Sequence, residues 1–239
     1  MRIDVFRDGT RLNSELDALY PSCLREAAVD GTIFLPHSEQ TPLPRYRRTA
    51  SKETVIYIED PDRRWLAGTT SFNRLIGLDR RLDQYVRSPH SRYREPYQRL
   101  GLAKRIYLEA LDAGLCLISS ARQSPAALQL WRALSRQYPL HHVRIENKCL
   151  VDLGRSIEWK TAGQLNTRLL LCGAGWSVEH LLSLTDPRPT AQQSASQVAV
   201  SLRLKQQLID SQTGHSTAPD FPGYARAYTV AKQQATHRR

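Results

Sequence analysis

Up to about residue 185, hydrophobic and polar positions along the chain follow the periods of strands and helices. Alternating, β-branched or aromatic runs predict strands at residues 1–7, 54–59, 65–72, 82–86, 115–119, 143–153 and 166–172. Apolar residues at helical spacing predict helices over about residues 13–28, 98–113 and 124–138. Strands and helices interspersed in this order predict an α/β fold.

Glycine, proline and capping residues set the limits of several predicted elements. Gly114 follows the second helix as a C-cap glycine, and Ser124 with Pro125 suits the cap and first turn of the third. Residues 60–62, Asp-Pro-Asp, predict a turn that joins the second and third strands into a β-hairpin. Residues 36–48 carry three prolines and three arginines and predict an irregular basic loop.

The composition changes beyond residue 185, where Gln, Ser, Thr, Ala and Pro dominate. Such a segment buries little apolar surface, so we expect a flexible basic tail with one helix candidate over residues 194–209. The sequence therefore predicts an α/β domain over residues 1–184 and a basic, partly helical C-terminal tail over residues 185–239. The apolar positions of the tail helix suit docking on the domain or on a second copy, which makes a homodimer one expectation.

Charge and cysteine content bound the partners and the compartment. The formal net charge of +11 and the pI of about 9.8 call for an anionic partner, either a phosphate-rich cofactor such as coenzyme A or nucleic acid. There is no C-x-x-C pair, no apolar signal region and no apolar run near the ~20 residues of a membrane span. We expect a cytoplasmic protein with no membrane partner. No metal site is expected either, because the adjacent His141 and His142 face opposite sides of a strand.

The most informative segment is Q-R-L-G-L-A, residues 98–103, between a predicted strand and a predicted helix. Gly101 and the small Ala103 let the backbone approach a phosphate, and the free N–H groups and dipole of a helix N-terminus favour an anion. Arg99, Lys104 and Arg105 add positive charge. The segment therefore predicts a phosphate site at the start of the helix.

This segment resembles the acyl-CoA signature Q/R-x-x-G-x-G/A of the GNAT superfamily of N-acetyltransferases, and the order of elements resembles that fold. The resemblance implies a mixed, mostly antiparallel sheet flanked by helices, with a C-terminal extension. It also implies direct attack of an acceptor amine on the thioester of acetyl-CoA or another acyl-CoA, with the Val86 backbone paired to the pantetheine arm. The residues that it assigns to the cofactor's phosphates are Gln98, Arg99, Leu100, Gly101, Leu102, Ala103 and Lys104.

A second match lies on the following helix, where Ser124, Ala127, Leu130 and Trp131 resemble the family's N-x-x-A-x-x-L-Y. The resemblance adds Ser124 and Trp131 to the cofactor-binding residues. Ser124 replaces the usual asparagine, and Trp131 replaces the tyrosine that in many members protonates the departing CoA thiolate. Tyr138, two turns beyond Trp131, is the candidate for a displaced acid. Trp131 itself fits core packing equally well.

In this family the general base usually lies on the strand before the signature or on the hairpin, so Asp83 and Glu59 are the candidates. Each also fits a strand-end carboxylate paired with a neighbouring arginine. Tyr85 alternates with Gln84 and is the residue expected to face the acyl group.

Basic residues around the signature exceed what a CoA site requires, which keeps a second function open. They are Arg74, Arg80, Arg81, Arg87, Arg92, Arg94, Arg99, Lys104 and Arg105. This surplus favours a GNAT-like protein that modifies nucleic acid or a charged tRNA. The missing tyrosine favours a catalytically silent GNAT-like binding module instead. The acceptor amine is not readable from the sequence.

Overall fold

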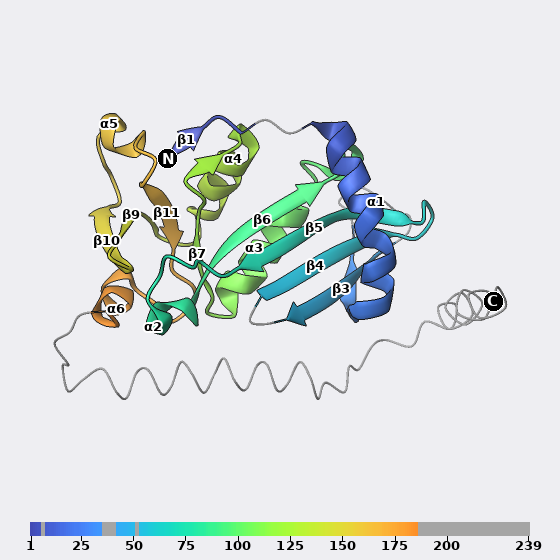
Figure 1. The fold of residues 1–239 in the computed structure, drawn as a ribbon, viewed down its shortest axis with the longest axis horizontal. Coiled ribbons are helices and arrows are strands. Elements are labelled where there is room, and N and C mark those ends of the chain that lie inside the picture. Colours follow the sequence, from blue (N-terminus) through green and yellow to red (C-terminus); the bar gives the residue numbers. More distant parts are fainter. Residues whose placement is uncertain (6–7, 35–41, 51–52, 186–239) are drawn as a thin grey trace. The chain divides into compact units, whose positions relative to one another are not determined.

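A nine-stranded sheet carries the fold in the computed structural model, which describes residues 1–5, 8–34, 42–50 and 53–185 (Figure 1). Its strand order is β10-β9-β11-β7-β6-β5-β4-β3-β2. These strands are β2 (Ala28–Ile33), β3 (Leu43–Ala50), β4 (Glu53–Asp60), β5 (Trp65–Asn73), β6 (Val86–Tyr93), β7 (Cys116–Ile118), β9 (Leu140–Glu146), β10 (Cys149–Gly154) and β11 (Arg168–Leu171). The pairing is antiparallel except between β6 and β7, which run parallel. The fold is therefore α/β with a mostly antiparallel sheet.

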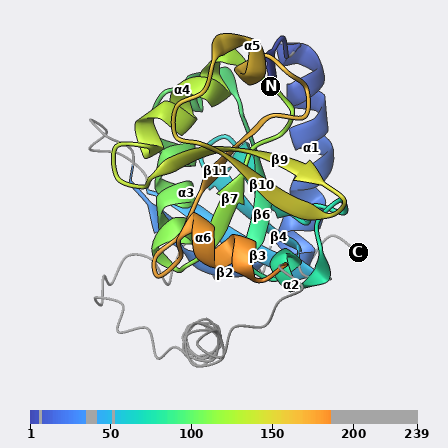
Figure 2. The same cartoon turned by 90° about the vertical axis from the view of Figure 1, so that its left-hand side faces the viewer.

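Helices cover both faces of this sheet (Figure 2). They are α1 (Gly9–Glu26), α2 (Arg80–Asp83), the 3-10 turn η1 (Glu95–Tyr97), α3 (Leu102–Asp112), α4 (Pro125–Leu134), α5 (Trp159–Ala162) and α6 (Val178–Ser183). Helix α1 packs on β3 and β5, while α3 and α4 pack on the opposite face. A short parallel pair, β1 (Arg2–Ile3) with β8 (Arg122–Gln123), lies beside α4.

The main core lies between the sheet and helices α3 and α4. Ile56 and Ile58 of β4 meet Ile106 of α3 and Trp131 of α4 there. A second, smaller core lies under α1, where Leu16 contacts residues of β3, β4 and β5. Because β4 presents alternate residues to the two faces, one strand contributes to both cores.

Several local signals are confirmed. The Ser124 hydroxyl accepts a hydrogen bond from the Ala127 N–H at 3.1 Å, and Pro125 opens α4. Gly114 follows α3 with a φ of 85°, the left-handed conformation that suits glycine. The hairpin of β4 and β5 turns over residues 61–64.

Other boundaries differ from the sequence predictions. Residues 82–86 were predicted as a strand. Leu82 and Asp83 instead end α2, and the strand, β6, begins only at Val86 and continues to Tyr93. The strand predicted over residues 143–153 is a hairpin, in which Asn147 and Lys148 take φ values of 50° and 68°. Two successive residues at positive φ are typical of the tight hairpin turn that matches strand twist.

The N-terminal half contains further corrections. Helix α1 begins at Gly9 behind an Asp8 cap and continues through Pro21, because burial of Leu16 and Cys23 against the sheet outweighs the lost backbone hydrogen bond. The predicted first strand is reduced to β1. Strand β2 was missed altogether.

The predicted basic loop over residues 36–48 lies partly outside the described residues, but from residue 43 onward it is strand β3. Apart from Thr185, the predicted C-terminal tail also lies outside them, together with its helix candidate. Among the helices that the structure describes, none has the length and apolar character needed to cross a membrane.

Gly68 of β5 generates a test of this packing. A methyl group built on Gly68 would lie 2.5 Å from the Arg92 carbonyl oxygen and closer still to the Tyr93 ring of the neighbouring strand. We expect Gly68→Ala to lower the free energy of unfolding by about 1–3 kcal/mol, the usual cost of overpacking. Urea unfolding measures this. Gly77→Ala is the control, since its added methyl meets nothing within 4 Å, and equal stability of the two variants would contradict the prediction.

Candidate functional site

Strands β6 and β7 are paired only where they begin. Val86 pairs with Cys116 and Arg87 with Leu117, and the register ends at this second pair. Strand β6 continues to its end paired with β5 alone. Pro89 helps to explain the break, because proline has no N–H to give to a ladder and is confined to strand edges. Residues 88–93 thus lack a strand partner on the β7 side within the described chain, and we call this side the open edge of β6 (Figure 1).

Helix α3 begins shortly after the open edge, behind a glycine in the left-handed conformation. Gly101 has a φ of 78°, and its carbonyl accepts the first helical hydrogen bond from Arg105 N–H at 2.9 Å. The N–H groups of Leu102, Ala103 and Lys104 have no hydrogen-bond partner among the residues described, and no side chain caps the helix. A methyl built on Gly101 meets nothing within 4 Å. An uncapped helix N-terminus with open space beside it has the features of an anion site.

The loop between β6 and α3 is anchored at several points. The Gln98 side-chain amide donates to the Tyr93 carbonyl at 2.8 Å, which ties the signature glutamine to the end of β6. The Trp65 indole N–H donates to the Tyr97 hydroxyl at 3.2 Å, and the Arg94 guanidinium lies 4.3 Å over the Trp65 ring. Gln98 therefore shapes the loop through its side chain. The signature's leucines are partly buried (Leu100) or buried (Leu102) in the main core.

Four hydroxyl groups form a chain on the α3 side of β6. The Thr70 hydroxyl lies 2.8 Å from that of Ser91 and 2.9 Å from that of Tyr93. The Ser91 hydroxyl donates in turn to the Tyr107 hydroxyl of α3 at 3.3 Å. The Tyr107 ring meets Trp131 of α4 edge-on, with centroids 6.4 Å apart. Hydroxyls from β5, β6 and α3 thus converge where β6 has lost its β7 partner.

On the opposite face of β6, His90 and Ser120 approach each other across the separation of the two strands. The Ser120 hydroxyl lies 3.5 Å from His90 Nε2, and Ser120 follows the end of β7. Gln123 adds an amide that donates to the Ser120 carbonyl at 3.5 Å, and its own Oε1 is buried without a partner in the described chain. His90 is a residue that sequence reasoning missed. The signal was its alternation with Val86, which becomes visible once the strand is placed at residues 86–93.

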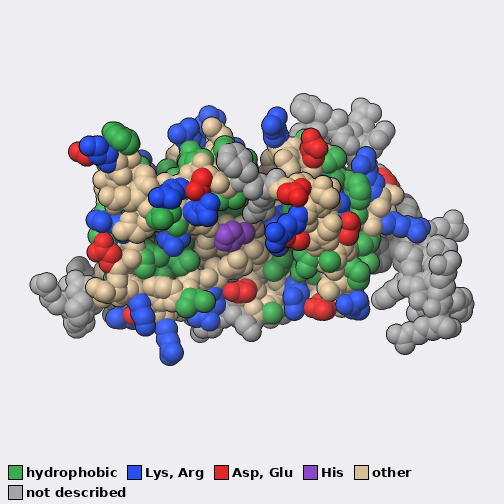
Figure 3. All heavy atoms as spheres, turned by 45° about the horizontal axis from the view of Figure 1, so that its top comes forward, with side chains coloured by type: hydrophobic (Ala, Val, Ile, Leu, Met, Phe, Trp, Pro, Cys, Tyr) green, Lys and Arg blue, Asp and Glu red, His purple; other side chains and the backbone are tan. Residues whose placement is uncertain are grey.

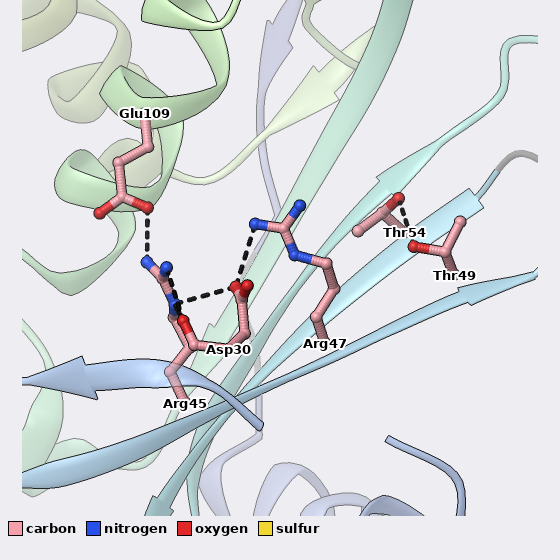
Figure 4. Close-up of polar contacts among 6 residues, drawn as sticks. All are labelled: Asp30, Arg45, Arg47, Thr49, Thr54 and Glu109. Carbon is pink, nitrogen blue, oxygen red and sulfur yellow. Dashed lines mark hydrogen bonds and ion pairs between the residues drawn. The ribbon is translucent and has the colours of Figure 1, made fainter. Parts of the chain in front are cut away.

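Many of the basic residues assigned to an anionic partner are paired with carboxylates instead. Arg45 contacts Asp30 at 3.0 Å and Glu109 of α3 at 2.5 Å, and Arg47 contacts the same Asp30 at 3.0 Å (Figure 4). Further ion pairs are Arg48 with Glu26, Arg74 and Arg87 with Asp83, Arg81 with Asp79, Arg92 with Glu15, and Arg94 with Asp17. Figure 3 shows positive and negative side chains interspersed on one face.

Three cations beside the start of α3 differ from this pattern. Arg99, Lys104 and Arg105 have no carboxylate partner in the part of the chain that the structure describes. The Arg105 guanidinium donates to the Phe34 carbonyl, at 3.4 Å. Positive charge left uncompensated at a helix N-terminus reinforces the anion site.

The two carboxylates predicted as general bases lie in structural networks. Glu59 is buried under α1, where the hydroxyls of Tyr20 and Tyr46 each donate to it at 2.6 Å. Asp83 is on α2 and not on the strand, buried against Arg74 at 2.6 Å. Asp83 is therefore paired with arginine, as its alternative predicted, whereas Glu59 is held by two tyrosines, and neither lies on the open edge of β6.

The predicted acid is also displaced from the signature. Tyr138 donates its hydroxyl to Asp112 at the C-terminal end of α3. Because α3 rises by about 1.5 Å per residue, this end lies roughly 15 Å from Leu102 at its start. Trp131 is buried in the main core, as packing alone would require, and the Ser124 hydroxyl caps α4.

Tyr85 and Val86 do not reach the open edge either. The Tyr85 ring packs against Trp176 with centroids 4.4 Å apart, on the side of α6. Val86 is in register with Cys116, so its backbone is paired with β7 and is not open to a ligand. The open part of β6 begins two residues later.

A scan against protein-family models finds no match, and searches of curated proteins and of solved structures find none either. Within the described residues, no group of three or more His, Cys, Asp or Glu side chains is arranged to hold a metal ion.

The Tyr138–Asp112 contact predicts a specific alkaline effect. Burial and the hydrogen bond to Asp112 raise the pKa of Tyr138 to about 12. The unfolded chain ionises this phenol near its ordinary pKa of about 10, so it binds fewer protons than the folded chain between these values and stability falls as pH rises. Tyr138→Phe should therefore lose stability less steeply from pH 10 to pH 12 in urea unfolding. Equal slopes for the two proteins would contradict this assignment.

Proposed function

We propose that this chain is an acyl-CoA-dependent N-acyltransferase that transfers an acetyl or other acyl group to an acceptor amine. The observation that carries the proposal is the open edge of β6, followed after a short loop by an uncapped helix whose first N–H groups have no partner among the described residues. A strand edge offers backbone hydrogen bonds to the amide groups of a pantetheine arm. The start of α3 offers N–H groups and cations to the pyrophosphate. The two features lie in the order that one extended acyl-CoA molecule would require.

The residues present fit such a ligand. In the proposed complex the N–H groups of Leu102, Ala103 and Lys104 bind phosphate oxygens, and Arg99 adds charge. Gly101 leaves room for the phosphates, and its backbone conformation favours glycine. Gln98 holds the loop to β6 rather than binding the ligand. The Ser91 backbone and the Tyr93 N–H, not Val86, pair with the pantetheine amides, because alternate residues of β6 bond to β5.

His90 is the best-placed base for the acceptor amine. Histidine changes charge near neutral pH, and His90 lies on the open edge beside Ser120. The amine nitrogen attacks the thioester carbonyl carbon, and its proton passes to the imidazole. The carbon–sulfur bond then breaks and its electron pair goes to sulfur. On the other face of β6, the Tyr107 hydroxyl, which accepts a hydrogen bond from Ser91, returns a proton to that sulfur.

A catalytically silent binding module is the second candidate. Trp131 favours it, because α4 contributes a packed indole and no hydroxyl at this position. Turnover separates the two candidates, since a silent module binds acyl-CoA without consuming it. The nucleic-acid alternative is weakened by the ion pairs of the arginines, and salt-dependent retention on nucleic acid tests it.

Acyl-CoA binding is the direct test. We expect native mass spectrometry of the purified chain to detect bound CoA species, and calorimetry to measure acetyl-CoA binding. Gly101→Glu places a carboxylate against the phosphates and should weaken binding about tenfold or more, ~1.4 kcal/mol. Gly175→Glu is a matched control, because Gly175 has a φ of 81° and equal open space. The proposal fails if the unmodified chain does not bind, and the phosphate assignment fails if both variants bind equally.

The role of His90 predicts a separate kinetic effect. His90→Gln keeps a polar group near Ser120 but cannot accept the amine's proton, so kcat should fall about 10²–10⁴-fold. Affinity for acyl-CoA should stay the same. The measurement is kcat at saturating acyl-CoA, with an amine that the unmodified chain acylates. An unchanged kcat would assign the proton to another base.

A further inference from the structure

Two buried cysteines lie opposite each other at the foot of strands β7 and β11. The antiparallel register pairs Leu171 with Leu117 and Leu170 with Ile118, and one more step places Cys172 opposite Cys116. Opposite residues of an antiparallel pair point to the same face of a sheet. Both side chains are buried, Cys116 completely and Cys172 with 5% exposure. Two thiols far apart in the sequence are therefore neighbours across one strand pair.

The hydrogen-bond pattern fixes how close these residues come. Ser119 N–H donates to the Leu169 carbonyl at 2.8 Å, and the same register places these two residues opposite each other. Hydrogen-bonded and non-hydrogen-bonded pairs alternate along an antiparallel ladder, so Cys116 and Cys172 occupy a non-hydrogen-bonded position. Cα atoms at such positions lie about 4.5 Å apart, inside the ~4.4–6.8 Å range of disulfides.

The thiols interact in the reduced protein and are held in a rigid place. Burial and the side-chain hydrogen bond with Cys172 raise the pKa of Cys116. Its sulfur also accepts a hydrogen bond from Gly173 N–H at 3.4 Å. A methyl built on Gly173 would lie 2.6 Å from the Leu115 carbonyl oxygen, so the two chain segments pass in close contact. Neither strand needs to move far for the sulfurs to meet.

We propose that Cys116 and Cys172 form a redox-sensitive dithiol that hydrogen peroxide converts into a cross-strand disulfide. Peroxide oxidises the Cys172 thiol to a sulfenic acid and releases one water molecule. The Cys116 sulfur then attacks that sulfur, the S–O bond breaks, and the thiol proton leaves with the hydroxide as a second water molecule. Two thiols and one peroxide thus give one disulfide and two waters.

The position of this bond gives it a structural consequence. Cys116 is also the residue in register with Val86, within the two-residue stretch where β6 and β7 pair. A disulfide there ties β7 to β11 beneath the open edge of β6. It cross-links residues distant in the chain and so restricts the unfolded state, which stabilises the folded protein. This inference does not depend on the proposed acyltransferase function.

The raised pKa also sets the expected kinetics. Because burial disfavours the Cys116 thiolate, Cys116 should react slowly with alkylating reagents at neutral pH. Once one sulfur is oxidised, the second lies within bonding reach and closure is intramolecular. Cys172 reacts first because exposed Ala174 and Gly175 follow it directly and give a small oxidant access from one side.

Peptide mass mapping tests the dithiol. The experiment uses the full chain with Cys149→Ser, which removes a partly exposed thiol. This protein is treated with hydrogen peroxide and then denatured in the presence of an alkylating reagent that blocks free thiols. It is digested without reductant. We expect one linked peptide pair that joins Cys116 to Cys172, lighter by two hydrogen atoms, and a higher melting temperature that dithiothreitol reverses. Cys23 is the internal control, because its buried thiol has a pKa raised to about 12 and should be recovered alkylated.

A matched variant separates this result from random oxidation. Cys172→Ala in the same background should give no linked peptide and no reversible rise in melting temperature. Should that variant fold poorly, the linked peptide in the parent protein decides alone. Recovery of Cys116 and Cys172 as thiols or as sulfonic acids after peroxide treatment, or linkage of either one to Cys23, would overturn the proposal.

Discussion

The candidate site depends on one hydrogen-bond ladder that stops early. Strands β6 and β7 share a register over two residues and then part, which leaves the rest of β6 with a partner on only one side. Pro89 cannot donate to a second ladder, and β7 gives its other edge to β11. The hydroxyl chain, the His90–Ser120 contact and the loop to α3 are all positioned by this separation. Longer pairing of β6 with β7 would remove the site while leaving both cores intact.

Features with a local cause were predictable from sequence. The Ser124 cap, the Pro125 start of α4 and the Gly114 end of α3 each need only a few neighbouring residues. The helix after the signature was also predicted, although from Gln98 and not from Leu102, where α3 begins. The main error lay just upstream, where the residues before Val86 were read as the strand and β6 was placed too early. That shift moved every expected side chain and hid His90.

Ion pairs and hydrogen bonds between residues that are distant in sequence could not be predicted in the same way. The charge of Arg45 gives no sign that Asp30 and Glu109 lie beside it, because both partners are distant in sequence. Glu59 shows the same limit, since the Tyr20 and Tyr46 hydroxyls that bind it come from α1 and β3. Residue type thus indicates which chemistry is available. Packing decides which of these groups are already satisfied by the protein itself.

Because many arginines are paired with carboxylates, the electrostatic field far from the protein and the charges at its surface are set by different residues. Beyond roughly 8–10 Å at physiological salt the field of exposed charges is largely screened, and what remains reflects the net charge of +11. An anion is thus drawn toward the whole molecule. At contact it meets many guanidinium groups already paired with carboxylates, whereas Arg99, Lys104 and Arg105 have no carboxylate partner among the described residues. Collision frequency and binding position are then set by different residues, so added salt slows the encounter without changing where an anion settles.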